Sequence, residues 1–197
     1  MFMNTFVIAI FTCIISTIFV LSVAYSMSRM RFKMRKPFMN IAMIIGLFPS
    51  FMSMIAVYYI LRALNLADGA MIRVALIIVF SAGSGAGFYV AKGFFDTISK
   101  SLDEAAIIDG ATRWNVFTKI TVPLSKPIIV YTILTSFMGP WVDFIFGKVI
   151  CRADAQYYTV SIGLWKMLEK EYIDSWYTCF AAGAVVVSIP IAILFLM

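Results

Sequence analysis

The sequence predicts an all-helical (all-α) integral membrane protein with five membrane-spanning helices. Of its 197 residues, 62% are hydrophobic and only 13% are charged, whereas a typical water-soluble domain is about half apolar and a quarter charged. The apolar residues fall into five runs of roughly 20 residues, the length that an α-helix needs to cross the core of a bilayer. Charged residues gather between these runs, as expected for the loops of a membrane protein.

The five expected helices follow one another along the whole chain. They cover Asn4–Tyr25, Phe38–Leu61, Met71–Val90, Pro127–Ile150 and Tyr177–Met197. The first is not expected to be a signal peptide, because no basic segment precedes it and its apolar run is too long. In the third, the small residues between Ser81 and Gly87 predict close packing against another helix. In the fourth, Gly139 and Pro140 predict a kink.

The loop charges orient the helices across the membrane. The first loop contains five cationic residues and no acidic one: Arg29, Arg31, Lys33, Arg35 and Lys36. Loops rich in Lys and Arg stay on the cytoplasmic side, so this loop and the long loop from residue 92 to residue 126 are expected there. The N-terminus then lies outside and the C-terminus inside. These loops also explain the net charge of +6, which needs no nucleic-acid partner.

The longest polar segment, Asp103–Pro127, contains the signals of two short helices joined by a turn. Just before it, Ser101 forms a capping box with Glu104, in which each side chain satisfies a backbone N–H at the start of a helix. Gly110 suits the left-handed residue that ends a helix. The segment is therefore expected to be a compact and well-capped hairpin.

The second helix of this hairpin also has recognisable ends. Thr112 can cap its start, and Pro123 is expected to end it. Its apolar residues lie three or four positions apart and so share a face: Trp114, Phe117 and Ile120 or Thr121.

The composition offers little for catalysis or for metal binding. There is no histidine, and Cys13, Cys151 and Cys179 lack the spacing of a metal site. We therefore expect no bound metal and no catalytic residue. Asp143 is the only acidic residue within an expected span. An intramembrane carboxylate usually belongs to a transport pathway, although Asp143 can equally lie near the wet outer end of its helix.

Aromatic residues are further candidates for a transport pathway, because sugar sites combine aromatic faces with a few polar groups. Together with Asp143, the candidates are Tyr59, Phe137 and Trp141, with Tyr58 beside them. The alternative is that these aromatic residues belong to the helix core or to the aromatic belts at the membrane surface.

One spacing within the hairpin resembles the motif of a known family. Glu104, Ala105 and Ala106 are followed after three residues by Gly110, after nine more by Ile120, and then by Pro123. This resembles the EAA motif of ABC importer permeases, with Val122 where leucine is usual. Asp109 and Ala111 fit the form of this motif found in sugar transporters.

The resemblance covers essentially the whole chain. Residues 25–32, with the sequence YSMSRMRF, resemble the end of a helix in these permeases, and residues 92–95 and 123–127 resemble the segments around the motif. The match is strongest to the oligosaccharide branch, in the style of the smaller maltose/maltodextrin permease subunit. That subunit has six spans, so the resemblance implies that residues 1–197 are one transmembrane domain without the first span and the C-terminal tail.

The resemblance implies a non-enzymatic permease subunit that moves a maltodextrin-like or galactose-containing oligosaccharide across the bacterial cytoplasmic membrane. The two short helices would dock into a cytoplasmic ATPase subunit. The residues implied in this coupling are Glu104, Ala105, Ala106, Asp109, Gly110, Ile120 and Pro123. The implied partners are a second permease subunit, two copies of the ATPase subunit and an extracytoplasmic solute-binding protein. This chain would bind no cofactor, because ATP and Mg²⁺ belong to the ATPase subunit.

Two other classes of function are weaker matches to the sequence. A secondary transporter driven by an ion gradient usually shows paired intramembrane charges and repeated broken helices, whereas only Asp143 fits that description here. A membrane-embedded enzyme would need a catalytic group of residues at membrane depth, and the acidic residues lie mostly in loops.

Overall fold

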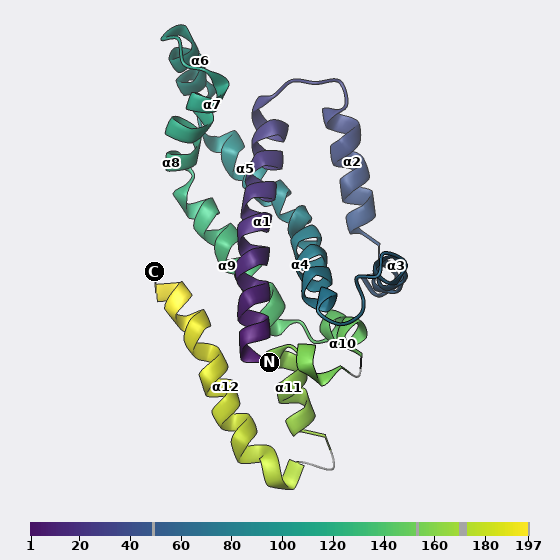
Figure 1. Cartoon of the computed structure of the whole chain (residues 1–197). Helices are drawn as coiled ribbons and strands as arrows, with labels where there is room; N and C mark the ends of the chain where they lie inside the picture. The colour runs from purple at the N-terminus through teal and green to yellow at the C-terminus, as the bar shows by residue number, and fades with distance from the viewer. Residues whose placement is uncertain (49, 153, 170–172, 197) are drawn as a thin grey trace. The chain divides into compact units, whose positions relative to one another are not determined.

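The computed structural model describes residues 1–48, 50–152, 154–169 and 173–196. Helices joined by short connections make up these residues, and no β-strand occurs among them (Figure 1). The expected all-helical class is therefore confirmed. Contacts divide the chain into two compact units. Unit 1 comprises Met1–Cys13, Pro49–Ala82 and Leu134–Met197, and unit 2 comprises Ile14–Phe48 and Gly83–Ile133.

Helix α1 (Phe2–Arg29) corresponds to the first expected span and extends beyond it at both ends. Its length and apolar composition are sufficient to cross a membrane. The last turn contains Arg29, a favourable position for a cation because the carbonyl end of a helix is partially negative. This extension places Ser28 and Arg29 on a regular helix rather than in a loop.

The second expected span is not one helix, and that prediction was wrong. Two helices replace it, α2 (Arg35–Gly46) and α3 (Ser50–Ala63). At 12 and 14 residues, each is shorter than the roughly 20 residues of a straight membrane span. The sequence accounts for the break, because a proline at position 49, outside the described residues, disfavours helical backbone in the residue before it.

The third expected span is confirmed as a helical run from Met71 to Thr97 that is long and apolar enough to cross a membrane. It consists of α4 (Met71–Gly83), the 3₁₀ turn η1 (Ser84–Gly87) and α5 (Phe88–Thr97). The close packing expected of its small residues is seen at Gly87, where an added Cβ would lie 3.8 Å from the Val20 side chain of α1, and not at Gly83 or Gly85, where it would meet no atom within 4 Å. The small residues lie where the backbone tightens into a 3₁₀ turn.

The fourth expected span is interrupted. Helix α9 (Lys126–Val142) is followed by α10 (Ile145–Cys151). Pro140 lies inside α9, where its ring nitrogen cannot donate to the carbonyl one turn earlier, and the helix ends two residues later. The break thus falls at Asp143 and Phe144, just after the Gly139–Pro140 pair that predicts a kink.

The remaining helices are α11 (Val160–Met167), preceded by the 3₁₀ turn η3 (Ala155–Tyr157), and α12 (Ile173–Leu196). Helix α12 matches the fifth expected span, and Ser175–Leu196 is long and apolar enough to cross a membrane; Met197 lies outside the described residues. Within the described chain, three helices meet that criterion singly. A fourth candidate is a helix pair bent by 80°, Arg113–Leu124 and Lys126–Val142. The count of five spans stays a prediction.

Among its described residues, unit 1 contains two apolar clusters, one around Ile8, Leu76 and Ile150 and another that includes Phe137 and Trp141. Polar side chains of α1 tie it to the segment before α11. Asn4 Nδ2 donates to the Gln156 carbonyl at 2.7 Å, and the Val160 N–H donates to Thr5 Oγ1 at 2.9 Å.

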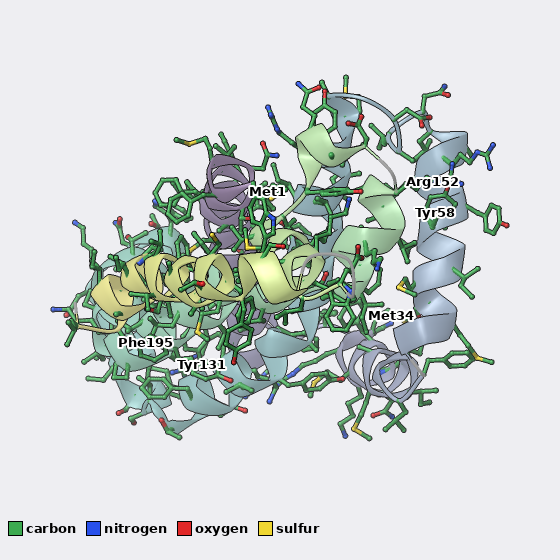
Figure 2. All side chains as sticks on the ribbon, turned by 90° about the horizontal axis from the view of Figure 1, so that it is seen from below. Met1, Met34, Tyr58, Tyr131, Arg152 and Phe195 are labelled. Atoms are coloured by element: carbon green, nitrogen blue, oxygen red, sulfur yellow. The ribbon has the colours of Figure 1, made fainter. Side chains whose placement is uncertain are left out.

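A second tie within unit 1 joins α3 to the end of α10. The guanidinium of Arg152 lies 4.8 Å from the centre of the Tyr58 ring, and Figure 2 labels both side chains. This is within the range in which a cation is attracted to an aromatic face.

Unit 2 has one apolar cluster, formed by the C-terminal half of α1, by α5 and by the start of α9. Its members include Val20, Ala24, Ala91, Phe95 and Ile128. This cluster fixes the end of α1 beside the end of α5, and the polar hairpin follows directly after α5.

Candidate functional site: the hairpin from Lys100 to Leu124

The hairpin begins with α6 (Lys100–Ile108), and the residue that caps this helix is Ser99. The Ser101 N–H donates to Ser99 Oγ at 3.3 Å. The predicted capping box starting at Ser101 was therefore wrong by two positions. Ile98 and Ser99 have extended backbone, with ψ angles of 128° and 130°, so the helix already begins at Lys100 and includes Ser101.

Gly110 forms the turn of the hairpin, as expected. Its φ angle is +84°, in the left-handed region that favours glycine. The Gly110 N–H donates to the Ile107 carbonyl at 3.0 Å, and the Ala111 N–H donates to the Ala106 carbonyl at 2.9 Å. Together these two bonds form a Schellman motif, which satisfies carbonyls that the end of α6 would otherwise leave open.

The second arm of the hairpin is a continuous helical segment of changing pitch. It consists of α7 (Arg113–Val116), the π-helical turn η2 (Phe117–Thr121) and α8 (Val122–Leu124). Thr112 caps it as expected, since its Oγ1 accepts the Asn115 N–H at 3.3 Å.

The prediction that Pro123 ends this segment was wrong, because the helix continues to Leu124. Pro123 is the second residue of α8, directly after the π-helical turn η2. The direction of the chain changes instead at Ser125, a fully buried residue directly before α9.

One face of the second arm packs on the rest of unit 2, and the other face is exposed. Val116 and Thr121 are buried, and the ring of Phe117 lies 4.7 Å from the ring of Tyr25 in α1. Trp114 shares a face with Phe117, as the helical spacing predicts, with the two ring centres 5.8 Å apart, but Trp114 is 70% exposed. At the tip of α6, Ile108 is 85% exposed.

The residues of the predicted coupling motif lie mostly on the open side of the hairpin. Five are exposed: Glu104, Ala105, Asp109, Gly110 and Pro123. The other two, Ala106 and Ile120, are half-buried. The structure thus brings the motif together on one hairpin, in which α6 and the second arm lie beside each other (Figure 1).

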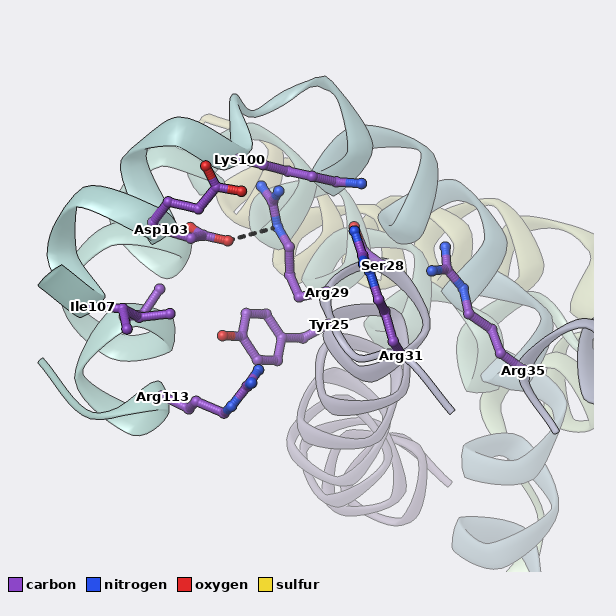
Figure 3. Close-up of a pocket in the computed structure, with 11 residues that line it drawn as sticks. Tyr25, Ser28, Arg29, Arg31, Arg35, Lys100, Asp103, Ile107 and Arg113 are labelled. Atoms are coloured by element: carbon purple, nitrogen blue, oxygen red, sulfur yellow. Dashed lines mark ion pairs between the residues drawn. The ribbon is translucent and has the colours of Figure 1, made fainter. Parts of the chain in front are cut away.

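Arg29, at the end of α1, holds the first turn of α6 in place (Figure 3). Its Nε lies 3.2 Å from Oδ2 of Asp103. Its Nη2 donates to the carbonyl oxygens of Phe95 and Ile98 at 3.0 and 2.9 Å. The Arg29 side chain is only 4% exposed. A single guanidinium therefore joins α1, the end of α5 and the start of α6.

Sequence reasoning did not assign this role to Arg29, which it treated only as one of the loop cations. The available signal was Asp103, an acidic residue in the first turn of a short helix. A second ion pair, between Lys92 and Asp96, lies on α5, and Ser28 Oγ donates to Asp96 at 2.6 Å. These contacts add to the attachment of α1 to α5.

The residues predicted to line a transport pathway lie in different surroundings within unit 1. Phe137 and Trp141 are buried in an apolar cluster with Ala9 and Val160, whereas Tyr59 is 63% exposed on α3. The structure therefore does not bring the four candidates together as one lining.

Asp143 is half-buried at the break between α9 and α10. Its Oδ2 accepts the Gly147 N–H at 2.9 Å, and its carbonyl accepts a hydrogen bond from Ser161. The carboxylate thus stabilises the first turn of α10. Among the described residues, no group of three or more His, Cys, Asp or Glu side chains is arranged to hold a metal ion.

Several long apolar helices combined with an exposed polar hairpin are typical of an integral membrane protein. The chain belongs to the family of binding-protein-dependent transport system inner membrane components, whose model matches residues 18–197.

Its relatives include the galactooligosaccharides transport system permease protein GanQ of Bacillus subtilis, which is 34% identical over 197 residues, covering 100% of this chain and 68% of GanQ. The maltodextrin transport system permease protein MalD of Streptococcus pneumoniae is 31% identical, covering 98% of this chain and 68% of MalD. Both relatives are transport permease subunits and not enzymes.

A solved structure with the same fold belongs to a bacterial ABC transporter involved in the import of the acidic polysaccharide alginate. It aligns with a TM-score of 0.79 and 26% identity, covering 98% of this chain and 71% of the matched chain. The predicted family is thus confirmed, and with it the location in a membrane.

Proposed function

We propose that this chain is the permease subunit of an ATP-driven importer that carries an oligosaccharide across the bacterial cytoplasmic membrane. Support for the substrate class comes from the relatives, which are named for galactooligosaccharides and maltodextrin. Support for ATP-driven transport comes from the family and from the hairpin. The hairpin is the observation that carries the proposal, because its shape and surface suit a docking element.

The hairpin has the properties needed to transmit a movement from a partner. It is rigid, since both helices are capped and the Schellman motif closes the turn between them. It also exposes large apolar side chains, with Ile107 48%, Ile108 85% and Trp114 70% exposed. Apolar side chains grouped on a polar element usually mark an interface, and aromatic anchors often dominate the binding energy.

The proposed partner on this surface is a cytoplasmic ATPase subunit, with Glu104, Ala105 and Ala106 in the contact. The small alanine side chains permit close approach, and the Glu104 carboxylate is free to pair with a cation of the partner. The complete importer would contain two ATPase copies with their ATP and Mg²⁺, a second permease subunit and an extracytoplasmic solute-binding protein. In this arrangement the hairpin faces the cytoplasm, the N-terminus lies outside and the C-terminus lies inside.

A substitution at the exposed tip tests this proposal. Ile108→Asp should leave the fold intact, because the side chain is 85% exposed, but it should weaken docking to the ATPase subunit. We expect sugar-stimulated ATP hydrolysis by the reconstituted importer to fall about tenfold, equivalent to about 1.4 kcal/mol. Glu104→Lys should act in the same direction if that carboxylate pairs with the partner.

Met34→Asp is the matched control. Met34 is also an apolar residue of unit 2, with a side chain that is 62% exposed, but it lies in the loop before α2 and not in the hairpin. This variant should retain normal ATP hydrolysis. Unchanged coupling in Ile108→Asp, or an equal loss in Met34→Asp, would show that the hairpin tip is not the docking surface.

A further inference from the structure

A cavity of about 400 Å³ lies between the end of α1 and the hairpin, entirely within unit 2 (Figure 3). Its walls come from the last turns of α1, the loop that leads to α2, and helices α6 and α7. The side chains that line it are mostly polar: Tyr25, Ser28, Arg29, Arg31, Arg35, Lys100, Asp103, Glu104, Ile107, Arg113 and Val116.

The cavity is strongly cationic. Five of its side chains are Lys or Arg, against two carboxylates, so the lining carries an excess of three positive charges. Arg29 is engaged by Asp103. Within the described part of the chain, the other four cations, Arg31, Arg35, Lys100 and Arg113, make neither a salt bridge nor a side-chain hydrogen bond. Such a concentration of unpaired cations favours an anionic ligand.

Arg29 adds a specific feature at the wall of this cavity. The side chain as a whole is only 4% exposed. Its Nη1 is buried and has no hydrogen-bond partner among the described residues. A buried N–H group without a partner is costly. Guanidinium groups match the oxygens of a phosphate with paired hydrogen bonds, so a phosphate group is the anion that this lining fits.

The position of the cavity identifies the source of that phosphate. Tyr25, Ser28 and Arg29 occupy the last turns of α1, a helix able to span the membrane, and Arg31 and Arg35 follow immediately. The end of a spanning helix lies at the level of the lipid headgroups, where basic pockets bind anionic lipids. A soluble phosphate would meet the same chemistry, but the cavity stands where phospholipid headgroups are concentrated.

We propose that this cavity binds the phosphate of an anionic phospholipid in the leaflet that the end of α1 reaches. The headgroup is held by Arg31 and Arg35 from one side and by Lys100 and Arg113 of the hairpin from the other. A bound lipid therefore contacts the same hairpin that is proposed to dock the ATPase subunit. This inference goes beyond the proposed function and depends only on the membrane location of the chain.

The test is lipid retention by the intact complex that contains this chain, extracted from membranes containing phosphatidylglycerol. After washing in about 0.5 M NaCl, where the screening length falls to about 4 Å, bound lipid is counted by native mass spectrometry. The wild type should retain phosphatidylglycerol in preference to phosphatidylcholine. Arg31→Gln combined with Arg35→Gln should reduce retention about tenfold, since each cation near a lipid surface contributes measurably to binding.

Lys33→Gln combined with Lys36→Gln is the matched control, because it removes the same charge from the same loop at positions that do not line the cavity. It should retain the lipid. Arg31→Lys combined with Arg35→Lys keeps the charge and should restore most of the retention, which separates binding from misfolding. Neither ATP nor sugar is present, so the result is independent of the proposed transport function.

An equal loss of lipid in the arginine and lysine pairs would overturn the proposal, since it would show only general attraction to a charged loop. Failure of the wild type to retain phosphatidylglycerol would also overturn it. A separate titration with inorganic phosphate in phosphatidylcholine nanodiscs distinguishes the source. Saturable phosphate binding without lipid retention would assign the cavity to a soluble anion and reject the lipid.

Discussion

The guanidinium of Arg29 has partners on two further segments of unit 2, the carboxylate of Asp103 in α6 and the carbonyl oxygens of Phe95 and Ile98 at the end of α5. Each partner would otherwise be a poorly solvated acceptor. The geometry explains why arginine is suited to this position. A lysine ammonium would keep the charge but lacks the planar fork that reaches several acceptors at once.

Replacement of Arg29 should therefore loosen the hairpin. We expect Arg29→Ala to destabilise unit 2 by about 3 kcal/mol, because it leaves the largely buried Asp103 carboxylate without its cation. Arg29→Lys should cost less, and Arg29→Ala combined with Asp103→Asn should recover part of the loss. Thermal unfolding in detergent gives the order, and limited proteolysis at Arg113 reports local opening of the hairpin.

Arg62→Ala is the control for this series, since Arg62 is an exposed arginine in the last turn of α3. It should unfold at the wild-type temperature. If Arg29→Ala and Arg62→Ala behave alike, the contacts of Arg29 do not hold the hairpin.

At the level of single residues, sequence reasoning succeeded where the signal was local. The left-handed Gly110 and the Thr112 cap both depend on the backbone within a few residues. It failed at Ser101, because neighbouring serines at positions 99 and 101 have the same capping chemistry and only the extended backbone at Ile98 and Ser99 decides between them. It missed Arg29 because the contact joins residues 74 positions apart in the chain, Arg29 and Asp103.

At the scale of the helical elements, a substitution at Gly110 tests how strongly this residue determines the geometry of the turn between the two arms of the hairpin. An added Cβ at Gly110 would meet no atom within 4 Å, but the φ angle of +84° is unfavourable for any other residue. We expect Gly110→Ala to cost about 1–2 kcal/mol through backbone strain alone. Gly110→Val should cost more, and both should reduce sugar-stimulated ATP hydrolysis.

Gly93→Ala is the matched comparison. Gly93 also has open space around an added Cβ, but it lies in α5 with ordinary helical backbone. Alanine favours a helix interior by up to about 1 kcal/mol over glycine, so this variant should unfold at the wild-type temperature or above. Equal melting temperatures for the two alanine variants would argue against strain at Gly110.

The helices themselves show which signals were sufficient. Length and apolar composition correctly predicted the helical runs of the first, third and fifth expected spans, each of which is long and apolar enough to cross a membrane. The second expected span failed because its composition is apolar throughout, whereas the structure has two helices there, one ending at Gly46 and the next beginning at Ser50. In the fourth, Gly139 and Pro140 pointed to a disturbance, and α9 ends two residues after Pro140, at Val142.

For the whole molecule, the proposed importer makes a prediction about energy source and substrate. Uptake into proteoliposomes should require ATP and persist after an ionophore has removed ion gradients. Neutral maltodextrin or galactose-containing oligosaccharides should be transported in preference to an acidic alginate fragment. This expectation follows the relatives that are named for galactooligosaccharides and maltodextrin.

Transport that stops when the ion gradient is removed, with ATP still present, would favour a secondary transporter instead. A preference for the acidic fragment would contradict the substrate class. Sequence reasoning reached the family because its motif is continuous in the chain, whereas the substrate depends on side chains brought together by folding and by a second subunit. The four pathway candidates illustrate this, since two of them are buried within the apolar core of unit 1.

The bend at Ser125 has a mechanical consequence. The helical segments Arg113–Leu124 and Lys126–Val142 meet at 80°. They therefore act as a bent lever, with a short arm in the hairpin and a long arm in α9. A pull along the short arm acts almost at right angles to the long one. Movement of the hairpin would therefore swing α9 sideways and hardly slide it along its own axis, which is the motion that opens or closes a passage between helices.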